Sequence, residues 1–292
     1  MRRDAFSALN PIVVFAYFAA VITLSMLLIS PVCLVLSCVC SIVYGIYLRG
    51  FRQAAFNLKI MLPTALTAAL INVLFNHRGM TVLCFFPSGN ALTLESVYYG
   101  LAMGAMIIAA VNWFSCLNAV LTSEKLSYLL GRIMPSLALV FSMILRFVPR
   151  FTEQYAKAAA AQTALYGEPK SFLQRLKRAV KISSIVLTWA FESSIDTADS
   201  MKARGYGSTK RSAYALYRWR REDTAVLAVI LAGVALTVTG YINGALYFAY
   251  TPRLYGETGI RAAVHTAVYG LMSAVPMIIN AAEEVKWRRL LS

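Results

Sequence analysis

The sequence contains little charge. Only 14% of its 292 residues are charged, whereas 59% are apolar, against about 25% and 45–50% in a typical soluble domain. The mean hydropathy of +0.63 is too high for one compact core, because a soluble chain must also cover itself with polar surface. This composition excludes the disordered, collagenous and disulfide-scaffold classes. We therefore expect a membrane protein.

Acidic residues are especially few: 13 Asp and Glu accompany 28 Lys and Arg, which gives a net charge of +15. An excess of cations can indicate nucleic-acid binding, but in a membrane protein it more often marks cytoplasmic loops. Residues 118–224 hold 17 of the cations and 8 of the acids, a net +9 of the total +15. That concentration predicts one basic cytoplasmic domain and no nucleic-acid partner.

The sequence also lacks the groups of side chains that catalysis, metal binding or ion-driven transport require. Its two histidines stand far apart, and its five cysteines have no partners at metal-site spacing. No ionisable residue is clearly placed inside an apolar span, where a charge is costly. Paired carboxylates, a nucleophile elbow and a zinc-peptidase helix are also missing. We expect no cofactor, no metal and no enzymatic activity in this chain.

One glycine-rich segment, residues 204–210, resembles a phosphate loop but has the wrong order. A Walker A loop requires Gly-x4-Gly-Lys followed by Ser or Thr, whereas here Thr209 precedes Lys210 and Arg211 follows it. No nucleotide is expected at Lys210. The segment instead predicts a helix end, in which Gly205 takes the left-handed cap position.

Long apolar runs predict an all-α, polytopic fold with about six membrane spans. Residues 11–48 are apolar almost throughout, and one helix of that length would measure about 57 Å, nearly twice the hydrocarbon core. Ser30-Pro31 therefore separates two spans, because the residue before a proline is pushed out of the helical region. A basic loop at 49–59 follows, and Pro63 is expected in the first turn of the third span. The expected spans are 11–29, 32–48, 60–75, 97–117, 225–247 and 263–282.

The cations orient these spans, because positive charge collects on the cytoplasmic side. Both termini are expected inside, and the apolar run after the first cations continues too far for a removed leader. We expect a four-span part at 1–117, a cytoplasmic domain at 118–224 and a two-span part at 225–292. The deciding cations are Arg2, Arg3, Arg49, Arg52, Lys59, Lys286, Arg288 and Arg289. Asparagines expected to bond across helices within the spans are Asn72, Asn112, Asn118, Asn243 and Asn280.

Two long amphipathic helices are expected within the cytoplasmic domain. Apolar residues recur at steps of three and four from Leu137 to Tyr155, with charged residues between them. Gly167 can end this helix and Pro169 can begin a second one, which should run to about Ala203. Such helices need an apolar partner surface: each other, the headgroup region or another protein. The stripe on the first helix that is expected to pack includes Phe141, Ile144, Val148 and Phe151.

Three short motifs in this domain carry a resemblance to a known family. They are Leu145-Arg146-Phe147-Val148-Pro149, then Ala161-Gln162, then Met201-Lys202-Ala203-Arg204-Gly205-Tyr206. With them, the chain resembles the transmembrane component of energy-coupling factor (ECF) transporters, the EcfT/CbiQ family. The resemblance covers nearly the whole chain in the order and size of its parts. Its most specific element is Ala-Arg-Gly at the end of a long amphipathic helix.

The resemblance implies a scaffold and coupling subunit of an ATP-binding-cassette (ABC) importer in a prokaryotic cell membrane. In that family two cytoplasmic coupling helices each end in an Ala-Arg-Gly-like motif, which docks on one of two ATPases. The membrane part holds a small substrate-binding subunit, the S component, which selects the cargo, a vitamin or a transition-metal ion. ATP hydrolysis then belongs to the ATPases, which are identical or different.

Site residues also follow from the resemblance. Ala203, Arg204 and Gly205 form the second coupling motif. The first coupling motif departs from the family pattern, because Ala164-Leu165-Tyr166-Gly167 places Leu165 where an arginine is expected. Docking of the first helix would then rest on shape and apolar contact, or on a divergent ATPase. The residues that match the upstream family motifs are Arg146, Pro149 and Gln162.

Two other functions remain open from the residues alone. A membrane protein of another class could lay the basic helices of 118–224 on anionic headgroups. A lipid-modifying enzyme is the third possibility, although the sequence offers it no acidic, histidine or metal constellation. Co-purification of ATPases distinguishes the first function from the other two.

Overall fold

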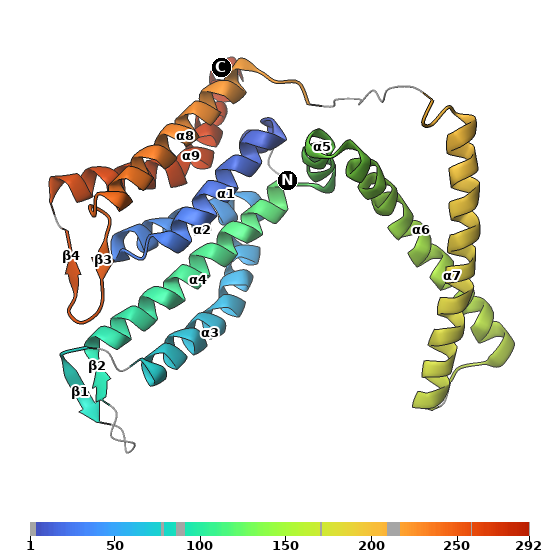
Figure 1. Ribbon diagram of the computed structural model, residues 1–292, viewed down its shortest axis with the longest axis horizontal. Helices are drawn as coiled ribbons and strands as arrows, with labels where there is room; N and C mark the ends of the chain where they lie inside the picture. Colours follow the sequence, from blue (N-terminus) through green and yellow to red (C-terminus); the bar gives the residue numbers. More distant parts are fainter. Residues whose placement is uncertain are drawn as a thin grey trace. The chain divides into compact units, whose positions relative to one another are not determined.

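The computed structural model describes residues 4–76, 79–85, 91–169, 171–208, 217–257 and 259–291. This part of the chain holds nine α-helices, one short 3-10 helix and two small antiparallel hairpins (Figure 1). The helices are α1 (Pro11–Leu27), α2 (Pro31–Arg49), α3 (Phe51–Phe75), α4 (Leu94–Val120), α5 (Ser123–Ile133), α6 (Pro135–Tyr166), α7 (Phe172–Ala203), α8 (Arg221–Ile242) and α9 (Ile260–Leu291), with the 3-10 helix η1 at Phe6–Ala8. The strands are β1 (Val82–Phe85), β2 (Ala91–Thr93), β3 (Phe248–Ala249) and β4 (Tyr255–Gly256).

The chain divides into two compact units. The first, here called the membrane unit, comprises residues 1–122 and 217–292, and the second, the helical insertion, comprises 123–216. Five helices of the membrane unit are long and apolar enough to cross a bilayer, namely α2, α3, α4, α8 and α9. The shorter apolar helix α1 has 17 residues, the lower limit for a span. The protein is a polytopic, α-helical membrane protein.

The two ends of the membrane unit differ. Both hairpins lie at one end, while the start of α1, the end of α4, the start of α8 and the end of α9 lie at the other (Figure 1). The helices therefore run through the unit an even number of times, α1 included. This arrangement places both ends of the unit on one side.

The helix boundaries confirm the break at Ser30-Pro31, since α1 ends at Leu27 and α2 begins at Pro31. The expected basic loop at 49–59 is wrong. Helix α3 begins at Phe51, directly after Gly50, whose φ of 85° allows the chain to turn within one residue.

The expected position of Pro63 in a first turn is also wrong, because it lies inside α3. Pro63 cannot donate to the carbonyl of Lys59. Such breaks are tolerated in membrane helices. The Thr67 hydroxyl donates to the Pro63 carbonyl itself, so it does not replace the bond that the Lys59 carbonyl lacks. The end of α8 at Ile242 is five residues short of the expected span, because the chain turns at Gly244 with a φ of 78°.

The core of the membrane unit is a cluster of fully buried aromatic rings. Phe6 of η1 and Tyr17 of α1 lie edge to face with ring centroids 5.1 Å apart, and Tyr17 lies 6.1 Å from Trp113 of α4. The polar atoms of these rings are bonded: the Tyr17 hydroxyl donates to the Ser273 carbonyl at 2.9 Å, and the Trp113 indole donates to the Ser37 hydroxyl at 3.0 Å. The cluster therefore joins η1, α1, α2, α4 and α9.

Helices α3 and α4 pack through small residues. A Cβ placed on Gly100 would lie 2.8 Å from the Ala69 carbonyl oxygen, and one on Gly104 would lie 3.1 Å from that of Ala65. This spacing of small residues four apart on both helices allows the backbones to approach closely, as it does in many membrane proteins.

The amino-terminal segment is bonded to the end of the chain. The Asn280 amide of α9 donates to Asp4 at 2.6 Å and accepts the backbone N–H of Ala5 at 2.8 Å, and the Tyr44 hydroxyl donates to Asp4 at 3.0 Å. The expected cross-helix role of Asn280 is confirmed. Among the described residues, the Nδ2 atom of Asn112 and the Oδ1 atom of Asn72 find no partner, so the expectation is wrong for these atoms.

A buried carboxylate fixes the start of α8. Asp223 is 1% exposed and accepts the backbone N–H of Asn10 at 2.8 Å and that of Arg220 at 2.8 Å. Because Asn10 caps α1 through its bond to Ile12, one side chain joins the first turns of two spanning helices.

We predict that Asp223→Ala lowers the free energy of unfolding by about 2–3 kcal/mol, because two buried N–H groups lose a charged acceptor. Thermal unfolding of the purified protein in detergent measures this as a lower midpoint. The matched control is Asp199→Ala, which removes only an exposed pair with Lys202 at 3.9 Å and should change stability by less than about 0.5 kcal/mol. Equal midpoints for the two variants would contradict the structural role of Asp223.

Candidate functional site

The helical insertion is built on α6 and α7, which are joined by a tight turn. Helix α6 ends at Tyr166, as expected, and Gly167 follows with φ 68° and ψ −171°, a conformation nearly restricted to glycine. Helix α7 ends at Ala203, also as expected, but begins at Phe172 rather than directly after Pro169. A third helix, α5, was not expected from the sequence.

Side chains of α7 hold the end of α6. Arg178 donates to the carbonyls of Ala159 and Gly167 at 3.3 and 3.2 Å, and it also donates to the Thr163 hydroxyl. Lys181 donates to the Tyr166 hydroxyl at 3.2 Å and lies 4.5 Å from the centre of that ring. The α6–α7 turn is therefore fixed by two cations from the second helix.

The first motif lies at this turn. Gln162 is buried with 7% of its surface exposed, whereas Leu165 is 72% exposed. Ala164 is also exposed. The end of α6 thus exposes the apolar Leu165 side chain. The helix end itself is held by the Arg178 bonds, and Gln162 is buried beside it.

The second motif lies at the end of α7. The N–H of Gly205 donates to the Lys202 carbonyl at 2.9 Å, and that of Tyr206 donates to the Met201 carbonyl at 3.0 Å. Gly205 has a φ of 82°, which confirms the expected left-handed cap. Ala203 and Arg204 are exposed at this helix end. The motif therefore presents an arginine on a closed helix terminus.

A cleft of about 640 Å³ brings two sequence motifs together. Arg146 of α6 lines it together with Arg204 and Gly205 at the end of α7. Arg150 and Asp196 also line it, so three cations face one carboxylate. Within the described part of the chain, Arg146, Asp196 and Arg204 take part in no ion pair. The cleft is therefore a basic surface able to accept an acidic group.

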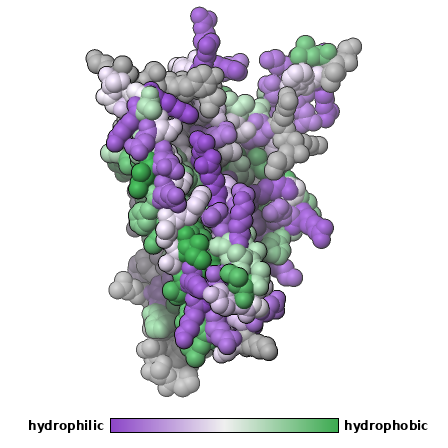
Figure 2. Space-filling view, turned by 90° about the vertical axis from the view of Figure 1, so that its right-hand side faces the viewer, coloured by the Kyte–Doolittle hydropathy of each residue, from purple (hydrophilic) through white to green (hydrophobic). Residues whose placement is uncertain are grey.

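In the sequence, Arg146 and Arg204 belong to separate motifs, 58 positions apart. The signal that could have joined them was the polar face of α7, where Ser193, Asp196, Thr197 and Ser200 recur at steps of three and four. Figure 2 shows hydrophilic side chains mixed with hydrophobic ones over α7. The apolar stripe of α6 is only partly covered: Phe151 meets Trp189 with ring centroids 5.7 Å apart, but Ile144 and Val148 remain 51% and 52% exposed.

Pro149 lies inside α6, three residues after Arg146. It cannot donate to the Leu145 carbonyl, and a proline within a helix bends it. The Thr152 hydroxyl donates to the Pro149 carbonyl at 2.7 Å. The proline thus removes one backbone hydrogen bond of α6 beside the residues that line the cleft.

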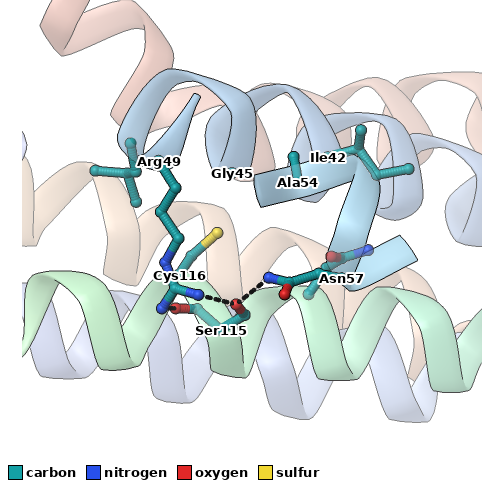
Figure 3. A pocket seen from close by; sticks show the side chains of 9 residues that line it. Ile42, Gly45, Arg49, Ala54, Asn57, Ser115 and Cys116 are labelled. Carbon is teal, nitrogen blue, oxygen red and sulfur yellow. Dashed lines mark hydrogen bonds between the residues drawn. The ribbon is translucent and has the colours of Figure 1, made fainter. Parts of the chain in front are cut away.

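A smaller polar cluster lies within the membrane unit. Arg49 of α2 donates to the hydroxyl and the carbonyl of Ser115 at 2.8 and 2.7 Å, and Asn57 of α3 donates to the same hydroxyl at 3.2 Å (Figure 3). The enclosed space is about 10 Å³, room for about one water molecule. The cluster joins α2, α3 and α4 and is too small for a substrate.

Neither unit offers a metal centre within the described residues, where no group of three His, Cys, Asp or Glu side chains is positioned to hold an ion. The Nδ1 atom of His265 lies 2.9 Å from the Leu236 carbonyl. His77 and the segment from Thr209 to Arg211, which includes Lys210, lie outside the described residues.

Comparison with known proteins gives one family. The family model CbiQ, described as cobalt transport protein, matches residues 5–214. A relative from Bacillus selenitireducens, named energy-coupling factor transporter transmembrane protein EcfT, is 36% identical over 112 residues, which are 37% of this chain and 41% of that protein.

Longer alignments have lower identity. The EcfT protein of Bacillus subtilis is 25% identical over 191 residues, 62% of this chain and 72% of that protein. The protein named EcfT 1 of Listeria monocytogenes is 24% identical over 216 residues, 67% of this chain and 77% of that protein. The chain therefore spans about two-fifths of the Bacillus selenitireducens relative and about three-quarters of the other two.

We predict that Gly167→Ala destabilises the α6–α7 turn by about 1–3 kcal/mol, because the backbone conformation of Gly167 excludes a Cβ. No atom lies within 4 Å of the added Cβ, so the loss would come from the backbone alone. Limited proteolysis at the turn should become faster. Gly259→Ala is the control, since that glycine has an equally open surrounding and no positive φ; equal cleavage of the two variants would refute the assignment.

Proposed function

Because the chain belongs to the cobalt transport protein (CbiQ) family, we propose that it is the transmembrane scaffold and coupling subunit of an ECF-type ABC importer. The observation that carries this proposal is the pair of exposed helix ends at Leu165 and Arg204 on a fixed helical hairpin. The chain would hydrolyse no ATP itself. Its role would be to pass motion of cytoplasmic ATPases to a substrate-binding membrane subunit.

Each helix end would dock on one ATPase of the ABC type. At the second end, Arg204 would bond a carboxylate of the ATPase, since a guanidinium binds carboxylates with two parallel hydrogen bonds. Ala203 and Gly205 are small enough to enter a groove beside it. The closed cap at Gly205 supports this role, because it holds the arginine on a defined helix end.

At the first end, Ala164 and Leu165 would dock through apolar contact. The two ends of the hairpin present different chemistry, one apolar and one cationic, so they fit two ATPases that differ from each other. The first end would be kept in place by the Arg178 bonds, by the buried Gln162 and by the turn at Gly167.

Arg146 and Pro149, which lie on α6, would support docking at the end of α7. Arg146 shares a cleft with Arg204, so a single acidic segment of a partner could contact both guanidinium groups. Pro149 would set the direction of α6 at this cleft. The half-exposed apolar residues Ile144 and Val148 would pack against a partner, for which the S component is the family's candidate.

The proposed location is the cell membrane of a prokaryote, with both termini and the helical insertion in the cytoplasm. The net +9 of residues 118–224 supports this orientation. The shared side of both ends of the membrane unit supports it as well (Figure 1). The cargo, a vitamin or a cobalt or nickel ion, would be chosen by the S component.

We predict that Arg204→Ala weakens association with the ATPases by about 2–5 kcal/mol, the range for truncating one side of a buried interfacial charge pair. Arg204→Lys should recover only part of this loss. Leu165→Ala should lose about 1–3 kcal/mol, because only apolar contact is removed. Co-purification of ATPases with the membrane-embedded chain, together with uptake, measures these effects.

Lys202→Ala is the matched control for Arg204→Ala, because it removes a neighbouring cation that is already paired with Asp199. It should retain ATPase association. If Arg204→Ala retains it equally, or if no ATPase accompanies the wild-type chain at moderate salt, the coupling role is refuted. Interfacial helices on the bilayer, or lipid-dependent turnover by a lipid-modifying enzyme, would then explain the basic insertion.

We predict that a single cysteine at Ser208, in a cysteine-free background, reacts with an impermeant thiol reagent only after the cell membrane is opened. Ser208 is exposed at the end of the described insertion, so its side reports the location of the coupling helices. A cysteine in place of Tyr255, at the hairpin end of the membrane unit, should react from outside. The reverse pattern would overturn the orientation.

A further inference from the structure

An apolar groove of about 500 Å³ runs between α8 and α9. Val229 and Leu236 of α8 and Leu271 and Ile278 of α9 line it, and each of these side chains is about half exposed. Gly233 brings the helices close at its floor, since a Cβ there would lie 3.2 Å from the Met272 side chain. The described part of the chain leaves this groove open.

The length of the groove matches one leaflet of a bilayer. Along α9 it extends from Val268 to Ile279, which at 1.5 Å per residue is about 16 Å. Half of a hydrocarbon core measures about 15 Å. One acyl chain lying along the helices would therefore fill the length of the groove.

A second hollow of about 680 Å³ continues the groove toward the end of α9. Ile278 lines both hollows, and Lys286 and Arg289 line the second one. The neighbouring Glu283 and Glu284 lie outside the lining of both hollows, and Glu284 is engaged by Arg288 at 3.1 Å. The end of the groove is therefore basic.

An aromatic side chain marks the same level of α9. Trp287 stands between the two cations in sequence and is 57% exposed. Tryptophan is enriched where a membrane helix meets the headgroups. Lys286 lies seven residues beyond Ile279, about 10 Å along the helix. Because helical side chains lean toward the start of their helix, the lysine side chain covers part of this distance toward a phosphate at the headgroup level.

We propose that the α8–α9 groove is a binding site for an anionic phospholipid. One acyl chain lies along Val229, Gly233 and Leu271, and the phosphate is bound by Lys286 and Arg289. The groove alone would accept the acyl chain of any lipid. The two cations would add selectivity for a negative headgroup, because basic residues between membrane helices attract anionic lipids.

The test uses the purified chain in neutral detergent, with dioleoyl phosphatidylglycerol and dioleoyl phosphatidylcholine as probes. Native mass spectrometry measures the dissociation constant of each lipid. One basic residue near an anionic lipid contributes about a fivefold gain, so the pair predicts a preference of roughly 25-fold for phosphatidylglycerol. The Lys286→Gln/Arg289→Gln variant should reduce this preference to about threefold or less.

The control is Arg253→Gln/Arg261→Gln, which removes two cations of the same membrane unit outside both hollows. It should keep the full preference, and so should Lys286→Arg/Arg289→Lys, which keeps both charges. Val229→Trp fills the groove and should weaken binding of both lipids.

The proposal fails if wild type binds the two lipids equally, or if the preference survives Lys286→Gln/Arg289→Gln or is lost in the control. It fails too if Val229→Trp leaves binding unchanged. ATPases are not needed for this measurement, so its result is independent of the proposed coupling role.

Discussion

Within a bilayer no water is available to bond a polar group, so a polar group without a partner inside the protein is costly. The membrane unit meets this constraint by bonding the polar end of one helix to the end of another. Asp223 of α8 accepts the N–H of Asn10, and Asn280 of α9 bonds Asp4. Arg49 at the end of α2 bonds Ser115 near the end of α4. The arrangement of the helices therefore follows from where their polar termini can be satisfied.

These bonds also prepare the connection to the helical insertion. The chain leaves the membrane unit after α4 and returns just before α8. The chain returns at Arg220, whose N–H donates to Asp223. It departs after α4, in which the Ser115 carbonyl accepts a hydrogen bond from Arg49. Both connections are thus tied to the same bonded end of the unit.

Much of this fold follows from the sequence because hydrophobic runs and helix-ending residues are local signals. The break at Ser30-Pro31 and the helix ends at Gly167 and Gly205 were predicted from proline and glycine chemistry alone. The start of α3 was not, because its cations suggested a loop, whereas Arg49 is satisfied by a serine of a distant helix. Local patterns carry no information about such a partner.

The candidate site shows the same limit. The exposed helix ends at Leu165 and Arg204 were predictable, since each residue lies at a glycine-marked terminus. The cleft shared by Arg146 and Arg204 was not, because it depends on how two helices cross. The buried position of Gln162 is likewise set by that crossing. Side chains that meet through packing are visible only after the packing is known.

The close contact of α3 and α4 at Gly100 and Gly104 has a consequence at a distance. Asn57 lies eight residues before Ala65 on α3, about 12 Å along the helix, with Pro63 between them. The close approach at the two glycines and the bond from the Asn57 amide to the Ser115 hydroxyl join the same two helices at separate points. A methyl group added at Gly100 would push α3 away from α4, and we expect the shift to lengthen the bond from Asn57 to Ser115, whose hydroxyl oxygen Arg49 also contacts.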